Sequence, residues 1–363
     1  MIMTDSPIRF PGLFGDWAFT ASSKAINIGH GIYWYGIIIA CGLLLAVAFC
    51  LRQRKHYGIS EDDLMDCILW GIPCGIIGAR LYYVIFYLDL FRDADGKFNW
   101  GKAVAIWDGG LAIYGGVIGA LLVGGLVAKL RKVKLMPMLD IVAVGFLLGQ
   151  GIGRWGNFTN HEAFGTNTDS IFGMSSGKIQ EWIVNNTAYA GNTLYGKGIN
   201  LSEHYPVHPC FLYESVWCLL GFFLLAYIAR KHRKFDGQIF LMYVAWYGFE
   251  RFFVEGLRTD SLYIGTLRVS QVLAAVSCVT AIVLLIVCYS RVKRMGADYH
   301  LYCDTAESKQ LLAEAAAREE NARKKREGDV ELTEKILAED EPEDTEPEAA
   351  SEEQTSETST DKD

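Results

Sequence analysis

The chain closes one of its long apolar runs, residues 136–155, with the stretch Gly153-Arg154-Trp155-Gly156-Asn157-Phe158-Thr159-Asn160-His161-Glu162-Ala163-Phe164-Gly165. A charged side chain at membrane depth is costly, so it is retained mostly for function and faces a protein interior or a water-filled cavity. Here an arginine, two asparagines and a glutamate are spaced by glycines and aromatic residues. The pattern indicates a polar cluster the size of a lipid headgroup, at the end of a membrane-spanning helix.

Apolar runs long enough to span a bilayer recur on both sides of this stretch. The chain has 363 residues, of which 51% are hydrophobic, and a run of about 20 apolar residues crosses the hydrocarbon core as a helix. We therefore predict an all-α polytopic membrane protein with seven transmembrane helices. They are expected at residues 32–51, 64–88, 109–130, 136–155, 210–229, 237–256 and 269–290.

The basic residues alternate with these expected spans. Clusters follow the first span, separate the third from the fourth and the fifth from the sixth, and follow the seventh. Because cytoplasmic loops carry an excess of Lys and Arg, the N-terminus is predicted outside and the C-terminus in the cytoplasm. The clusters are Arg52, Arg54 and Lys55; Lys129, Arg131, Lys132 and Lys134; Arg230, Lys231, Arg233 and Lys234; and Arg291, Lys293 and Arg294.

The net charge of −8 combines two unlike parts. Residues 301–363 carry 21 acidic and 8 basic residues, a net −13, whereas residues 1–300 carry 21 acidic and 26 basic residues, a net +5. The acidic end is poor in apolar residues, a composition typical of disorder. The expected parts are an outer N-terminal segment at 1–30, a seven-helix membrane domain at 31–295 with an outer cap loop at 156–207, and an acidic, largely disordered cytoplasmic tail at 296–363.

Glycines recur at four-residue spacing within several spans. This spacing lets helix backbones approach closely, so it predicts tight helix packing. The glycines are Gly71 and Gly75, Gly115 and Gly119, and Gly145, Gly149 and Gly153.

Polar residues from five expected spans fall in the same half of the membrane, because alternate spans run in opposite directions. This convergence predicts one polar cavity open to the outer leaflet or outer face. The alternative is that some side chains, Arg80 and Arg258 above all, merely snorkel to the outer interface. The residues are Arg80, Asp108, Tyr114, Arg154, Asn157, His208, Glu214, Glu250, Arg251, Glu255 and Arg258.

One helical face of the sixth expected span is polar. At about 100° per residue its members fall within an arc of about 80°. An internal ion pair between Arg251 and Glu255 that orients the bundle would explain this face, and it could coexist with a site in which Glu255 positions Arg251. Because the planar fork of arginine suits a phosphate, Arg154 and Arg251 are predicted to form a phosphate clamp. The face consists of Tyr247, Arg251, Glu255 and Arg258.

The stretch 153–165 closely resembles the signature of the bacterial prolipoprotein diacylglyceryl transferases, and the resemblance covers about residues 25–295. It implies a catalytic membrane domain in the bacterial cytoplasmic membrane. Such enzymes move the diacylglyceryl group of phosphatidylglycerol onto the lipobox cysteine thiol of a prolipoprotein signal peptide, forming a thioether and releasing glycerol phosphate. The further segments that agree are Trp34–Gly36, Gly78–Leu81, Trp107–Gly116, His208–Glu214 and Tyr247–Asp260.

The resemblance also implies which residues form the site. We add Asn160, Glu162 and Arg258 as substrate-binding candidates, because they share the opening stretch or the polar face. Arg154 and Arg251 are expected to stabilise charge growing on the leaving group. No cofactor, metal or nucleic-acid partner is implied. The residues that match the family's functional positions are Tyr35, Arg154, Asn157, Gly165, Tyr247, Arg251 and Glu255.

Tyr114 departs from the family pattern. Many members have His at this place, before Gly115-Gly116, and that His has been proposed as a catalytic base. A phenol, with an ordinary pKa of about 10, is a poor base at neutral pH. As a catalytic candidate, Tyr114 either hydrogen-bonds the substrate or leaves the thiol proton to another group or to water.

Two other functions would also be compatible with parts of the sequence. A lipid or organic-anion transporter would need buried arginines too, but no clear internal repeat is present and the polar residues sit in one half of the membrane rather than at its midplane. A membrane scaffold would explain the glycines but not the clamp.

Overall fold

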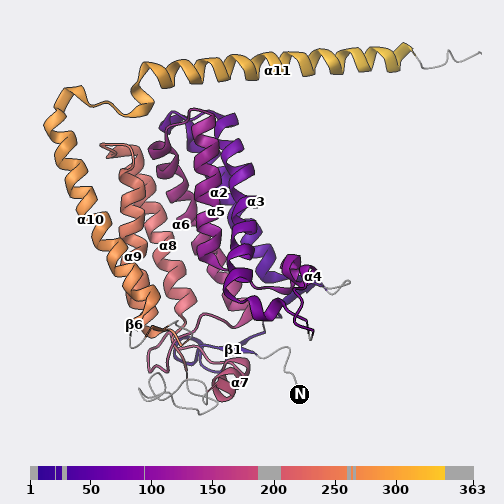
Figure 1. Ribbon diagram of the computed structural model, residues 1–363, viewed down its shortest axis with the longest axis vertical. Helices are drawn as coiled ribbons and strands as arrows, with labels where there is room; N and C mark the ends of the chain where they lie inside the picture. Colours follow the sequence, from indigo (N-terminus) through magenta and orange to yellow (C-terminus); the bar gives the residue numbers. More distant parts are fainter. Residues whose placement is uncertain are drawn as a thin grey trace, which may run out of the picture. The chain divides into compact units, whose positions relative to one another are not determined.

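The computed structural model describes residues 7–20, 22–26, 31–93, 95–186, 206–259, 263–264 and 267–339. The chain divides into two compact units, Met1–Ala313 and Glu314–Asp363. In the first unit the long helices run side by side as a bundle (Figure 1). They are α2 (Trp34–Gln53), α3 (Glu61–Phe86), α5 (Ile113–Leu130), α6 (Leu135–Asn160), α8 (Cys210–Lys231), α9 (Gln238–Leu257) and α10 (Val269–Met295).

Six helical stretches of the described chain are long and apolar enough to cross a membrane. The expected all-α polytopic membrane protein is confirmed to this extent. Helix α9 has a similar length, but it carries the charges of Glu250, Arg251 and Glu255. The six stretches are Trp34–Tyr57, Glu61–Phe86, Ile113–Leu130, Leu135–Asn160, Cys210–Lys231 and the helical run Val269–Val330, which begins with α10.

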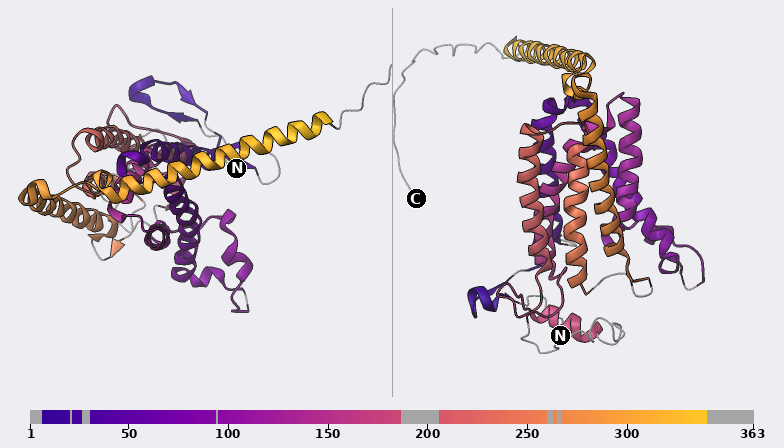
Figure 2. Two further views of the ribbon diagram at one scale, coloured as in Figure 1. Left: turned by 90° about the horizontal axis from the view of Figure 1, so that it is seen from above. Right: turned by 90° about the vertical axis from the view of Figure 1, so that its left-hand side faces the viewer.

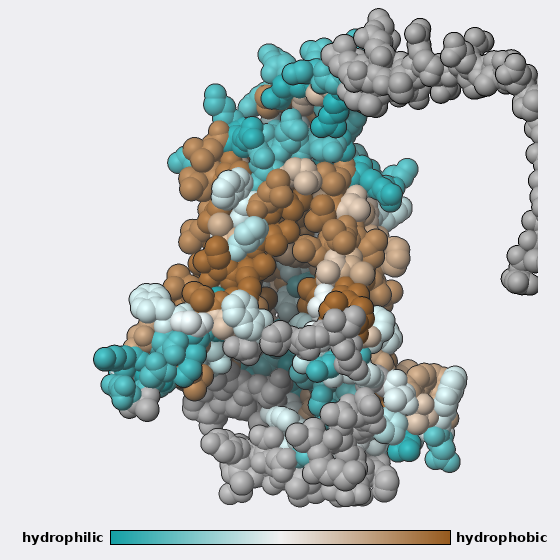
Figure 3. All heavy atoms as spheres, turned by 90° about the vertical axis from the view of Figure 1, so that its right-hand side faces the viewer, coloured by the Kyte–Doolittle hydropathy of each residue, from teal (hydrophilic) through white to brown (hydrophobic). Residues whose placement is uncertain are grey.

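Apolar side chains cover much of the outer surface of the bundle. Leu122 on α5 and Phe223 on α8 are 69% and 67% exposed. Figure 3 shows an apolar belt on one face, between more hydrophilic regions, with a hollow near its lower edge where hydrophilic residues lie at the floor. A continuous apolar surface of this kind marks contact with a membrane or a partner.

Glycines set the closest approaches between helices. Helix α3 packs along α5, and a Cβ atom added at Gly78 would lie 2.5 Å from the carbonyl oxygen of Gly115. Helix α2 packs along α6, where a Cβ at Gly42 would lie 3.2 Å from the carbonyl oxygen of Gly149. The tight packing predicted from the glycine spacing is thus confirmed at these two interfaces.

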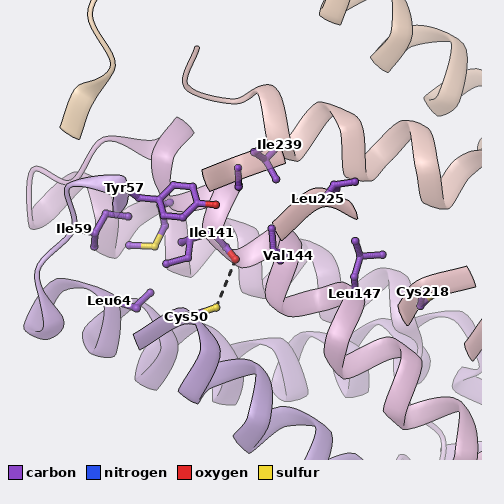
Figure 4. Packing of buried hydrophobic residues seen from close by; sticks show 12 residues of the cluster. Cys50, Tyr57, Ile59, Leu64, Ile141, Val144, Leu147, Cys218, Leu225 and Ile239 are labelled. Carbon is purple, nitrogen blue, oxygen red and sulfur yellow. Dashed lines mark hydrogen bonds between the residues drawn. The ribbon is translucent and has the colours of Figure 1, made fainter. Parts of the chain in front are cut away.

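The main hydrophobic core joins α2, α3, α6, α8 and α9 (Figure 4). The Cys50 thiol lies 3.6 Å from the Ile141 carbonyl oxygen within it. The buried residues of the core are Cys50, Tyr57, Ile59, Leu64, Met138, Ile141, Val144, Leu147, Cys218, Leu225, Ala229 and Ile239.

A carboxylate on α6 caps the N-terminus of helix α9. Asp140 is fully buried, and its two oxygens accept the backbone N–H groups of Gly237 and Phe240, both at 2.8 Å. The first N–H groups of a helix lack intrahelical acceptors and favour negative charge. Asp140 therefore fixes where α9 starts, and with it the height at which Arg251 and Glu255 stand at the other end.

Short segments form a cap at one end of the bundle, opposite the end at which α10 finishes (Figure 2). The hairpin of β1 (Ile8–Arg9) and β2 (Ala18–Phe19) joins the loop after α6, because the Arg9 N–H donates to the Ser175 carbonyl at 2.8 Å. The expected N-terminal segment and cap loop thus share one hydrophobic cluster. Its buried members are Ile8, Phe10, Ala163, Phe164, Met174, Ile179, Val207 and Phe211.

The expected cap loop at 156–207 is described only in part, since residues 187–205 lie outside the described residues. The first unit extends through Ala313, beyond the boundary at 296 that the sequence indicates for the tail. The remaining elements are α1 (Pro11–Phe14), β3 (Lys24–Ile26), β4 (Ile32–Tyr33), α4 (Trp100–Val104), α7 (Gly177–Asn186), β5 (Tyr263–Ile264), β6 (Leu267–Arg268), α11 (Ala306–Glu339) and the 3-10 turns Arg54–Tyr57, Leu88–Phe91, Ile106–Asp108, Gly296–Asp298 and Tyr302–Asp304.

Candidate active site

One buried carboxylate holds three arginines together near the cap. Glu214, in the second turn of α8, has no exposed surface. One of its oxygens pairs with Arg154 from the end of α6. The other lies 3.4 Å from Nη1 of Arg251 on α9 and 3.4 Å from Nη1 of Arg258, just beyond α9. We call these four residues the arginine cluster.

The ion pair expected along α9 is present. Arg251 Nη2 lies 2.5 Å from a Glu255 carboxylate oxygen one helical turn away. The side chains are 19% and 2% exposed, so the pair is shielded from water more than a surface pair would be. Arg251 therefore bridges Glu214 on one side and Glu255 on the other, and its guanidinium plane is held in place by both.

Glu250 is a third buried carboxylate beside the arginine cluster. It is 5% exposed, and neither of its oxygens has a hydrogen-bond partner in the part of the chain that the structure describes. It lies close enough to Glu214, Arg154, Arg251 and Arg258 to interact electrostatically with each. A buried carboxylate with idle oxygens is costly unless a proton or a ligand completes its bonding.

The cap fixes the ends of α8 and α9 around this cluster. The N–H of Gly165 donates to the His208 carbonyl at 2.8 Å, and the N–H of Thr166 donates to the Leu257 carbonyl at 2.9 Å. A Cβ at position 165 would stand 2.9 Å from both the His208 Cβ and the Leu257 carbonyl oxygen. Only glycine fits there, and its backbone bridge to Arg258 ties that arginine to the cap.

Helices α6, α8 and α9 are cross-linked by polar side chains next to the cluster. Ser215 Oγ donates to the Gly151 carbonyl at 2.7 Å and accepts from Trp155 Nε1 at 3.1 Å. Gln150 Nε2 donates to the Tyr243 hydroxyl at 3.1 Å. These bonds hold Arg154, Glu214 and Arg251 at fixed relative positions, which is the preorganisation that charge stabilisation requires.

Other candidate residues surround the cluster in different ways. Tyr247 stacks on Tyr243, with ring centroids 6.0 Å apart. The ring of Tyr35, at the start of α2, lies against Gly156, where an added Cβ would come within 2.8 Å of it. Tyr35 thus lies beside the end of α6, and Tyr247 lies on the polar face of α9.

The polar residues that follow Arg154 serve the cap through their backbones. The Asn157 carbonyl accepts the N–H of Glu162 at 2.9 Å, and the Asn160 carbonyl accepts from Lys178 Nζ at 2.9 Å. Glu162 itself is exposed. His161 takes the left-handed conformation, with φ 60°, that ends α6.

Tyr114 stands apart from the arginine cluster. It lies in the first turn of α5, is 40% exposed, and its ring centroid is 6.5 Å from that of Tyr82 on α3. Within the described ranges it makes no hydrogen bond or ion pair with the arginines. The described contact of Tyr114 is therefore with α3 and not with Arg154 or Arg251.

Arg80 neither joins the cluster nor snorkels to the interface. It is 8% exposed and donates to five backbone carbonyls of the loop between α3 and α5, which it thereby organises. Its acceptors are Lys102 at 2.7 Å, Ala103 at 2.8 Å, Ala105 at 3.1 Å, Gly109 at 2.5 Å and Gly110 at 2.9 Å.

The sequence pointed to Glu214 as one polar residue among many, and its role as the common partner of three arginines was missed. The segment His208–Glu214 carried a signal, because it contains a carboxylate within an otherwise apolar run. Burial lowers the pKa of the neighbouring His208, which favours its neutral form; its Nδ1 lies 3.2 Å from the Tyr213 hydroxyl. Among the described residues, no group of three or more His, Cys, Asp or Glu side chains is placed to hold a metal ion.

Fold and site together define a class, a helical membrane protein with a buried arginine–glutamate cluster near one end of its bundle. The family model of prolipoprotein diacylglyceryl transferase matches residues 23–287. The chain belongs to this family.

Similar proteins carry the name phosphatidylglycerol–prolipoprotein diacylglyceryl transferase. One from Limosilactobacillus reuteri is 44% identical over 257 residues, which cover 70% of this chain and 86% of that protein. One from Lactiplantibacillus plantarum is 45% identical over 247 residues, covering 68% and 81%. One from Listeria innocua is 40% identical over 278 residues, covering 76% and 92%.

Proposed function

We propose that this chain transfers the diacylglyceryl group of phosphatidylglycerol to the lipobox cysteine thiol of prolipoproteins. Family membership supports the reaction, and the names of the similar proteins give both substrates. The single observation that carries the proposal is the buried carboxylate of Glu214 bridging three arginines. In such a cluster the phosphate of a substrate can replace the Glu214 carboxylate as the partner of the arginines.

In the proposed reaction the cysteine sulfur attacks the carbon of the diacylglycerol moiety that bears the phosphate, not the carbon of the headgroup glycerol. A carbon–sulfur bond forms, the carbon–oxygen bond breaks, and glycerol phosphate leaves with the electron pair on its oxygen. Arg154 and Arg251, joined by Arg258, bind the phosphate through donors that otherwise contact Glu214. Glu255 keeps Arg251 oriented. The headgroup is surrounded by the remaining candidate residues, which are Asn157, Asn160, Glu162, Gly165, Tyr35 and Tyr247.

The thiol proton needs an acceptor, and we infer that Glu250 is better placed for this than Tyr114. Glu250 is buried beside the arginines with idle oxygens, whereas the contacts of Tyr114 are with Tyr82. Tyr114 would then contact the acyl chains or the peptide.

The proposed topology has seven spans, in which α9 is added as the sixth in chain order to the six apolar stretches. Its charged residues need no contact with lipid, because Glu250 and Glu255 are buried among neighbouring helices, as is expected of charges at membrane depth. The positive-inside rule supports an outer N-terminus, an outer cap and a cytoplasmic C-terminus in a bacterial cytoplasmic membrane. Family membership does not favour the alternative, a lipid or organic-anion transporter.

The test is release of glycerol phosphate by the purified full chain, given phosphatidylglycerol and a peptide with a lipobox cysteine. We expect release only when both are present, together with a gain of one diacylglyceryl group on the peptide. A peptide with serine in place of cysteine is the control, and it should remain unmodified. Glycerol phosphate release without peptide modification would indicate a hydrolase of the phospholipase C type and contradict the proposal.

A further inference from the structure

A second polar site lies at the end of the bundle opposite the cap. We call this the basic end; it comprises the loops at 52–60, 129–134 and 230–237 and the segment 296–308. A cavity of about 310 Å³ opens here, within the range of about 300–1,000 Å³ common for small-ligand sites. It is lined by Lys55, His56, Ala229, Arg230, Lys231, Arg233, Leu301, Cys303 and Asp304.

The lining carries a strong excess of positive charge. Four of its side chains are cationic at neutral pH, namely those of Lys55, Arg230, Lys231 and Arg233, and His56 adds a fifth basic group. Asp304 is the single acidic residue in the lining. Like charges gathered around one space repel each other, so an anion within it would stabilise the arrangement.

Arg233 shows where that anion would bind. The residue is 8% exposed, and its guanidinium lies 4.4 Å from the ring centroid of Tyr57. Nη2 donates to the His56 carbonyl at 3.0 Å and contacts the Cys303 sulfur at 3.3 Å. Among the residues that the structure describes, none accepts a hydrogen bond from the buried Nε and Nη1 atoms. A buried guanidinium with unfilled donors is costly unless an acceptor completes its hydrogen bonds, and a phosphate oxygen of an anion in the adjoining cavity would be such an acceptor.

The segment 296–308 closes one wall of the cavity, and it is firmly attached. The Tyr302 N–H donates to an Asp236 carboxylate oxygen at 2.9 Å, and the Asp236 N–H donates to the Tyr299 hydroxyl at 3.0 Å. Ser308, fully buried, donates to the Gly58 carbonyl at 3.2 Å. This wall lies beyond residues 23–287, which the family model matches.

We propose that this cavity binds a phosphate-bearing anion, with Arg233 as its main ligand and Lys55 and Lys231 as supporting cations. It is separate from the arginine cluster: Glu214 and Arg230 stand sixteen residues apart on α8, about 24 Å along the helix axis. Two sources carry such a phosphate group, an anionic lipid at the membrane face and a soluble phosphate. The proposal does not depend on the transferase reaction.

The experiment uses the full chain in phosphatidylcholine nanodiscs with two probes. Inorganic phosphate binding is measured by equilibrium dialysis, and phosphatidic acid binding by native mass spectrometry of nanodiscs that contain a small fraction of that lipid. Phosphatidic acid is chosen because it is not the proposed substrate. Saturable phosphate binding would identify a soluble source, and binding of phosphatidic acid alone would identify a lipid source.

Arg233→Gln should weaken binding of the relevant probe about tenfold or more, since hydrogen bonds to charged groups contribute about 1.5–3 kcal/mol. The double variant Lys55→Gln with Lys231→Gln removes two cations without touching Arg233, and it keeps the test valid if Arg233→Gln misfolds. Lys129→Gln, an exposed base on α5 outside the cavity lining, is the control and should bind normally. Absence of binding for both probes, or equal binding by the control and the cavity variants, would overturn the proposal.

Discussion

Replacing Arg154 by alanine tests the arginine cluster most directly. The side chain is 21% exposed and pairs with Glu214, so its removal takes one cation from the place where the phosphate is proposed to depart. Removing one donor of a preorganised charge-stabilising site lowers turnover by about 10²–10³, or about 2.7–4 kcal/mol. We expect a loss at the upper end of this range or beyond, because Arg154 supplies a full charge. Arg251→Ala should lose activity likewise.

The fold should survive the Arg154 substitution. Removing one partner of a buried ion pair costs about 3–5 kcal/mol when it leaves a charge uncompensated, but Glu214 keeps Arg251 and Arg258 at 3.4 Å. The cost to stability should therefore be smaller. Arg154→Lys retains the charge but loses the fork, and one lost charge-assisted hydrogen bond, at about 1.5–3 kcal/mol, predicts activity about ten- to a hundredfold below the parent.

The assay is the initial rate of glycerol phosphate release from phosphatidylglycerol with a lipobox peptide, alongside the thermal unfolding midpoint. Arg92→Ala serves as the matched control, since Arg92 is 54% exposed and lies 4.0 Å from Asp89. It should retain full activity. Near-normal turnover of a correctly inserted Arg154→Ala protein would refute the role assigned to the arginine cluster.

Four further changes test separate parts of the proposed site and of the tail. Tyr114→Phe should retain measurable transfer, because a phenol is a weak base at neutral pH; complete loss in a folded protein would restore Tyr114 as the base. Glu250→Gln should lower the rate by about 10²–10⁴, which is the usual contribution of general acid–base catalysis. An unchanged rate would exclude Glu250 as the acceptor of the thiol proton. A chain ending after Ala313 should match the full chain in rate and unfolding midpoint. One ending at Met295 should still transfer diacylglyceryl but unfold at lower temperature, since it loses the contacts of Tyr302; an inactive chain at normal abundance would point to regulation by the tail.

The helices and their packing could be predicted because the signals are local. An apolar run long enough for a membrane is visible without knowledge of its neighbours. The glycine spacing within single helices predicted that the backbones of α3 and α5 approach each other closely. The Arg251–Glu255 pair was predictable for the same reason, since one turn of helix brings both residues to one face.

Features that depend on the arrangement of several helices could not be predicted in this way. Glu214 meets its three arginines only when α6, α8 and α9 are packed together. Asp140 starts a helix about a hundred residues further along the chain. Arg80, on α3, binds the carbonyls of a loop whose path no local pattern specifies, and the ring contact of Tyr114 with Tyr82 depends on how α5 packs against α3.

Glu214 explains how the arginine cluster can bind the substrate phosphate and later release the product. Three guanidinium groups that face one another in a dry site need a counter-charge, and the Glu214 carboxylate, with no exposed surface, supplies it. The phosphodiester of phosphatidylglycerol carries one negative charge, and the phosphomonoester that leaves carries between about 1.5 and 2 at neutral pH. The attraction to the arginines therefore strengthens as the carbon–oxygen bond breaks, which is binding of the transition state in preference to the substrate. The same strengthening would retain the product, unless Glu214 competes for the arginines and returns to them as glycerol phosphate leaves.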